Sequence, residues 1–86
     1  MTIAISTATE LGATIRATRL AMGKTQVQLA EQIGCRRQTI GDLEAGRNVE
    51  VYTLMYVLAA LGKGLRIVDP SPELEELAYL FREDED

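Results

Sequence analysis

The sequence predicts a compact all-α fold of four to five short helices, followed by one short β-strand. Three observations predict it. Apolar residues recur at helical spacing, glycines stand where each helix should end, and the β-prone run near the C-terminus has no second run to pair with. At 86 residues the chain makes one small domain, and domains of this size often gain stability from a second subunit.

The first helix is predicted from a stripe of residues at i, i+4, i+7 and i+11, which are Leu11, Ile15, Thr18 and Met22. Gly23 should end this helix. Gly12 lies inside it and weakens its N-terminal turn, because glycine costs about 1 kcal/mol relative to alanine in a helix.

The second helix is predicted from a capping box, since Thr25 stands at the N-cap and Gln28 follows three residues later. Gly34 should end it as a C-terminal glycine. The residues of this helix that face inward are Leu29, Ala30 and Ile33.

A tight turn at residues 34–36 leads into a third helix, in which Ile40 and Leu43 are the buried pair and which Gly46 closes. After a loop at 47–49, a fourth helix runs to Gly62. Its apolar face consists of Leu54, Val57, Leu58 and Leu61. Short helices joined by tight loops are typical of a compact bundle.

The β-prone run at residues 65–68 is the predicted strand. A single strand leaves its backbone groups unpaired, and in a homodimer the same strand of the second copy is the obvious partner across a two-fold axis. A disordered connector is the alternative interpretation. The predicted dimerisation residues are Leu65, Arg66, Ile67 and Val68.

A short acidic helix is predicted after the strand, because Ser71 is a suitable N-cap and Pro72 a suitable first helical residue. Its apolar stripe consists of Leu74, Leu77 and Phe81. This stripe is large for so short a segment, so it should pack against something. Docking on a partner protein and folding back into the dimer are both open.

The composition argues against an enzyme. The chain has no histidine and a single cysteine, so it lacks the commonest general base, the usual metal ligand and every serine–histidine or cysteine–histidine pair. We therefore expect no catalytic residue, no metal and no cofactor, and we interpret Cys35 as a small turn or core residue. A cytoplasmic protein is favoured, because the chain has a single cysteine, no signal-like N-terminus and no apolar run long enough to span a membrane.

The charge divides along the chain. Residues 1–68 carry eight basic and five acidic side chains, whereas residues 69–86 carry one basic and eight acidic ones. The net charge of −4 therefore hides a mildly basic globular part, which holds the adjacent arginines Arg36 and Arg37.

A short helix, a glycine turn and a second helix with a polar N-terminus form a helix-turn-helix arrangement. Residues 11–62 resemble the Xre-type helix-turn-helix of phage repressors and Cro, through the run TQVQLAEQIGCRRQTIGDLEAG. The resemblance implies a lambda-repressor-like DNA-binding domain at residues 9–63. An N-terminal arm, expected to be flexible, would precede it at 1–8, and a dimerisation strand with an acidic tail would follow at 64–86.

The same resemblance implies roles for individual residues. The implied base contacts in the major groove are Arg37, Gln38 and Asp42. The implied phosphate contacts are Gln26, Arg36, Thr39, Arg47 and Asn48. Arg19 and Glu44 are implied as a structural ion pair. An ordinary solvated helix start is the alternative interpretation of residues 36–38.

The chain departs from the family pattern at two positions. Arg36 stands where the family often has a capping serine or threonine, which leaves the start of the third helix poorly capped. Gly41 weakens the middle of that helix but lets the backbone approach DNA closely. Both departures bear on the base contacts.

The wider layout is similar to that of the HipB-like antitoxins, through the helix end and strand at residues 53–69. That similarity implies a homodimer on an inverted-repeat operator, with recognition helices about 34 Å apart. It also implies repression of the protein's own operon and a HipA-like serine/threonine kinase toxin as partner, with the stripe of the acidic helix as a possible contact. Two alternatives remain, a free-standing repressor without a toxin and a protein-binding adaptor with the same fold.

Overall fold

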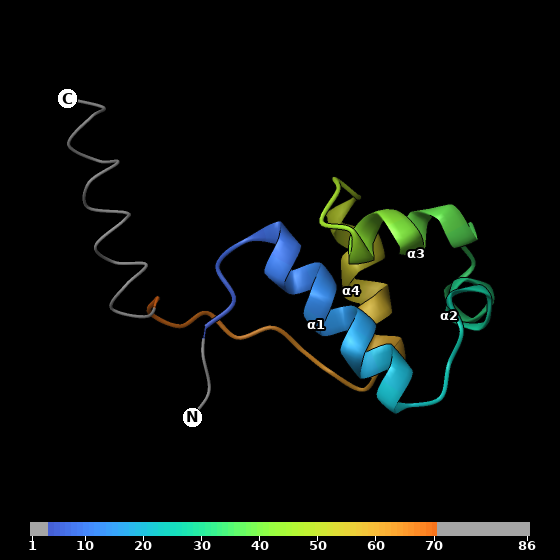
Figure 1. Cartoon of the computed structure of the whole chain (residues 1–86), viewed down its shortest axis with the longest axis horizontal. Coiled ribbons are helices and arrows are strands. Elements are labelled where there is room, and N and C mark those ends of the chain that lie inside the picture. Colours follow the sequence, from blue (N-terminus) through green and yellow to red (C-terminus); the bar gives the residue numbers. More distant parts are fainter. Residues whose placement is uncertain (1–3, 71–86) are drawn as a thin grey trace.

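The computed structural model describes residues 4–70, and the predicted acidic helix with Leu74, Leu77 and Phe81 lies outside the described residues. The described part forms four α-helices, α1 (Ala8–Ala21), α2 (Gln26–Ile33), α3 (Arg37–Glu44) and α4 (Val51–Ala60). Figure 1 shows them gathered into one bundle. The predicted all-α fold is confirmed.

The helix boundaries follow the predicted caps. Thr25 and Gln28 form both halves of the capping box, with Gln28 N donating to Thr25 Oγ1 at 3.0 Å and Thr25 N donating to Gln28 Oε1 at 2.8 Å. α3 begins after Arg36, whose side chain makes no capping hydrogen bond, as the sequence predicted. The four glycines predicted to end helices all have positive φ; they are Gly23, Gly34, Gly46 and Gly62.

The core is built from all four helices. Its buried apolar residues are Ile15, Leu29, Ala30, Ile40, Leu43, Val57, Leu58 and Leu61. Burying one such large aliphatic side chain contributes about 1.5–3 kcal/mol, so these residues supply most of the drive for folding. Ile33 and Leu54, which the sequence placed inside, are half-buried at the edge of this core.

Met22 corrects the predicted stripe of the first helix. α1 ends at Ala21, and Met22 is its C-cap residue, with 46% of its surface exposed. The helical spacing that places Ile15 in the core therefore no longer applies at Met22, because the backbone has left the helix.

α1 packs closely against α3. α2 packs against both α3 and α4. Gly12 lies at the contact between α1 and the end of α3. A Cβ atom at Gly12 would lie 2.4 Å from the carbonyl oxygen of Leu43 and 2.5 Å from that of Glu44. The glycine that the sequence marks only as a weak point is thus required by the packing of two helices.

Residues 63–70 leave the bundle as a segment without helix or strand, visible in orange in Figure 1. Leu65 and Val68 are 57% and 53% exposed, and Ile67 is fully exposed. A strand pairing across a two-fold axis needs a second chain, so this pairing stays a prediction.

Candidate nucleic-acid interface

The turn between α2 and α3 is short because Gly34 reverses the chain. Gly34 has φ 77°, a left-handed conformation that glycine adopts without a Cβ clash. The amide of Cys35 then donates to the carbonyl oxygen of Ala30 at 3.0 Å, which closes the end of α2. This turn places α3 directly against α2. The side of α3 that faces away from the core stays exposed.

The outer face of α3 carries the predicted base contacts. Ile40 and Leu43 are buried, and each residue of an α-helix is rotated about 100° from the last, so Gln38 and Asp42 lie on the opposite side. Arg37 is exposed in the first turn of the same helix. The structure therefore brings Arg37, Gln38 and Asp42 together on one helix.

Arg47 and Asp42 form an ion pair, with Arg47 Nη1 lying 3.1 Å from Asp42 Oδ1. The family resemblance implied separate roles for these two residues, a phosphate contact for Arg47 and a base contact for Asp42. The Arg47 side chain is 72% exposed and that of Asp42 is 29% exposed. Exposed pairs of this kind contribute less than about 1 kcal/mol, so the two groups can separate at little cost.

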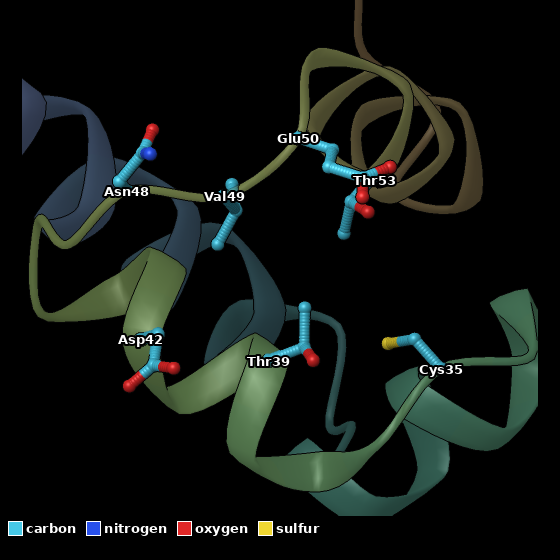
Figure 2. A pocket seen from close by; sticks show the side chains of 7 residues that line it. All are labelled: Cys35, Thr39, Asp42, Asn48, Val49, Glu50 and Thr53. Carbon is cyan, nitrogen blue, oxygen red and sulfur yellow. The ribbon is translucent and has the colours of Figure 1, made fainter.

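Two predicted phosphate contacts, Thr39 and Asn48, lie in a cleft of about 410 Å³ between α3 and the start of α4. Figure 2 shows the cleft with its other lining residues, Cys35, Asp42, Val49, Glu50 and Thr53. The carboxylates of Asp42 and Glu50 oppose a phosphate deep in this cleft. The sequence had no signal for Glu50, because the loop before α4 follows no pattern.

A buried polar network joins α1, α2 and α3. Arg19 donates to Glu44 through two nitrogens, with Nε 2.6 Å from Oε2 and Nη2 2.9 Å from Oε1. Arg19 Nη1 also donates to the carbonyl oxygen of Lys24 at 2.8 Å. The ion pair that the family resemblance implied is present, and its side chains are only 6% and 3% exposed.

Gln26, predicted to contact phosphate, belongs to the same network. It is the first residue of α2, and its Nε2 donates to Glu44 Oε1 at 3.1 Å. A side-chain amide carries two hydrogens, so one is left for a phosphate. The hydrogen bond from Gln26 to Glu44 thus ties the N-terminus of α2 to the end of α3.

The network stays charged. Burial by itself raises the pKa of Glu44, but the hydrogen bonds from Arg19 and Gln26 and the positive charge of Arg19 outweigh it and hold that pKa below its usual range. The hydrogen bond to Glu44 raises the pKa of Arg19. In contrast, burial raises the pKa of the Cys35 thiol, which disfavours the reactive thiolate.

Residues 4–70 contain neither a candidate membrane span nor a candidate metal site. None of the helices there has both the length and the apolar character needed to cross a bilayer. In the same residues there is no group of three or more histidine, cysteine, aspartate or glutamate side chains that could hold a metal ion.

Comparison with known proteins agrees with this geometry. The sequence matches the profile of a helix-turn-helix domain family over residues 10–86. No curated protein sequence matches it. Among solved structures, the "HipB-O4 20mer complex" and the "Structure of HipA-HipB-O2-O3 complex" each contain a chain with 27% identity and a TM-score of 0.74, covering 81% of this chain and 100% of that one.

A further chain, from a "HipB-O1-O2 complex", has 28% identity and a TM-score of 0.72, and the match covers 79% of this chain and 100% of that one. The profile spans most of the sequence, and the solved HipB chains are matched over their whole length. The chain belongs to the helix-turn-helix domain family and is a HipB-like member of it.

Proposed function

We propose that this protein is a sequence-specific DNA-binding repressor of the antitoxin type, which represses its own operon and neutralises a HipA-like kinase toxin in the cytoplasm. The observation that carries the proposal is the outer face of α3, where Arg37, Gln38 and Asp42 are presented beside a short glycine turn. A helix held in this way fits the major groove of B-DNA.

The three side chains suit different bases. Arg37 can donate two hydrogen bonds to guanine O6 and N7, and Gln38 pairs in the same way with adenine N6 and N7. Asp42 can accept from cytosine N4, provided that Arg47 shifts to a neighbouring phosphate. Phosphate contacts from Gln26, Arg36, Thr39, Arg47 and Asn48 would fix the register of α3 in the groove.

Repression follows from the arrangement of two subunits. A two-fold dimer presents two copies of α3 about 34 Å apart, which matches an inverted repeat with half-sites one helical turn apart. A dimer bound over its own promoter blocks transcription by occlusion.

The toxin partner is supported by a solved structure with 27% identity that contains HipB together with HipA. The kinase-type partner of this chain would be neutralised by binding, with Leu74, Leu77 and Phe81 as candidate contacts. A kinase-like reading frame beside the gene would favour the antitoxin over a free-standing repressor.

The decisive experiment is a binding titration against DNA from directly upstream of the gene, beside a scrambled duplex, at two salt concentrations. A repressor should prefer the native duplex, and its affinity should fall as salt rises, because phosphate contacts release counterions. Equal weak binding to both duplexes would refute sequence-specific binding and favour the adaptor alternative.

Arg37→Ala tests base readout. We expect a loss of about 1–3 kcal/mol per half-site and a relaxed preference at one base position. The matched control is Arg36→Ala, because Arg36 is adjacent, exposed and of the same charge, and its side chain makes no capping bond. The control should weaken all sequences alike and reduce the salt slope by about 1. Sequence-blind losses from both variants would show that Arg37 does not read a base.

A further inference from the structure

A groove of about 320 Å³ lies between the start of α1, the loop after α3 and α4. The apolar residues that line it are Leu11, Leu43, Val49 and Leu54. Leu43 belongs to the core, whereas the other three are only half-buried and leave apolar surface open to the groove. A volume of this size is at the lower end of pockets that hold a ligand, so a few apolar side chains would fill it. We call it the α1 groove.

Arg47 and Asn48 are the polar side chains that line the α1 groove. The side chain of Arg47 is 72% exposed, and none of the described residues that line the groove is acidic. The pair that Arg47 forms with Asp42 is a surface pair, which a second carboxylate can join or replace at little cost. The groove therefore favours an apolar segment that carries negative charge.

We propose that the α1 groove is occupied by the acidic C-terminal segment of the same chain, residues 71–86, through Leu74, Leu77 and Phe81. Residues 69–86 carry eight acidic side chains and one basic one, so the segment matches the groove in charge as well as in apolar character. Its covalent connection favours it over a free partner, because a short connection gives an effective concentration in the mM range.

The place at which the described residues end supports the same occupant. Figure 1 shows residues 63–70 leading from the end of α4 back toward the side of the bundle on which α1 begins. Phe81 follows Pro70 by eleven residues, which span about 16 Å as a helix and up to about 36 Å when extended. By comparison, α1 with its 14 residues is about 21 Å long. The segment is therefore long enough to bring Phe81 to the groove.

Occupation of the α1 groove would compete with DNA. This consequence rests on the proposed function, in which Arg47 and Asn48 contact phosphates. Acidic side chains held beside these two residues would take the place of the phosphates. If the segment must leave before DNA binds, the apparent affinity for every duplex is reduced in proportion to the fraction of molecules with an open groove. The preference for the native duplex over a scrambled one would be unchanged.

The test of docking is nuclear magnetic resonance of the full-length chain with a nitroxide spin label. The label is attached to the cysteine of Tyr79→Cys, and Cys35→Ser removes the natural thiol. Helical spacing places position 79 on the side of the segment opposite the apolar stripe, so the label does not occupy the proposed contact.

We expect the label to broaden the methyl signals of the groove residues Leu11, Val49 and Leu54. The signals of Val27 should stay sharp, because Val27 lies on α2, away from the start of α1 (Figure 1). Adding Phe81→Ser should abolish the broadening. Sharp groove signals, or equal broadening at Val27, would overturn the proposal. So would broadening of the groove of an unlabelled chain mixed with labelled ones, because the occupant would then come from another molecule.

DNA binding provides the second measurement, with Phe81→Ser as the variant and Tyr79→Ser as the control from the opposite side of the segment. The affinity of Phe81→Ser for the upstream duplex and for the scrambled duplex should rise by the same factor. A rise of about 2- to 10-fold corresponds to a groove occupied in half to nine-tenths of wild-type molecules. Tyr79→Ser should bind both duplexes as the wild type does. Unchanged affinity in Phe81→Ser, or an equal rise in both variants, would overturn the proposal.

Failure of the proposed function would be seen separately. If the wild type shows no preference for the upstream duplex while the groove signals are broadened, the repressor is wrong and the docked segment stands. If the preference is present but the groove signals stay sharp, the repressor stands and the docked segment is wrong.

Discussion

Arg19→Met is expected to lower the free energy of unfolding by about 3–5 kcal/mol, because it leaves the buried carboxylate of Glu44 without its guanidinium. Both side chains of the pair are almost fully enclosed. The variant also loses the hydrogen bond to the carbonyl oxygen of Lys24. Since small domains are stable by only about 5–15 kcal/mol, this one change removes a large share of the total.

The measurement is urea unfolding followed by circular dichroism, with Arg47→Met as the control. That control breaks a second arginine–carboxylate pair, Arg47–Asp42, which lies at the surface, and should lose less than about 1 kcal/mol. Equal losses from the two variants would mean that the buried network adds nothing beyond a surface pair.

The pH dependence of this pair has a definite sign. The pKa of Glu44 is lowered in the folded protein, so its contribution to stability is present above the ordinary glutamate value of about 4.3 and is lost as the pH falls through the lower folded value. In Arg19→Met the main cause of that lowering is gone, and burial then raises the pKa. The stability difference between wild type and variant should therefore be largest at pH 7, begin to shrink as the pH falls through the raised pKa of Glu44 in the variant, and shrink further below about pH 4.3, where the wild type loses the contribution of the charged pair. A difference independent of pH would contradict a charged pair.

Gly12→Ala is expected to lower the free energy of unfolding by about 1–3 kcal/mol, even though alanine is the better helix former by about 1 kcal/mol. The added methyl group would lie 2.4 Å from one backbone oxygen of α3 and 2.5 Å from the next. Backbone atoms cannot rotate away as a side chain can, so α1 and α3 must separate, and the Arg19–Glu44 pair between them would be disturbed.

Gly41→Ala is the matched control, since Gly41 also lies inside a helix. The nearest atom to an added Cβ there is the side-chain oxygen of Gln26 at 3.9 Å, an ordinary contact distance. This variant should gain up to about 1 kcal/mol from helix propensity. Thermal and urea unfolding of both variants would show whether the free energy of unfolding falls in Gly12→Ala and rises in Gly41→Ala. A stabilised Gly12→Ala would show that α1 and α3 do not approach so closely.

The four helices and most of their ends could be predicted from the sequence, whereas Met22 lies just beyond the end of α1. The capping box at Thr25 and Gln28 and the four terminal glycines depend on contacts within a few residues, and all of them formed as predicted. The inward-facing apolar residues were largely found as well, since helical spacing is a local property. The family resemblance added the ion pair and the identity of α3 as the candidate recognition helix.

Contacts between distant parts of the chain could not be predicted from the sequence and became visible only in the folded structure. Gly12 and Gly41 look alike in the sequence, and only the contact of α1 with the end of α3 separates them. The hydrogen bond from Gln26 to Glu44 spans 18 residues, and no pattern in the sequence signals it. Periodicity identified the core side of α4, but the exposed opposite side appeared only once the other helices were in place, because a local pattern does not record what covers a surface.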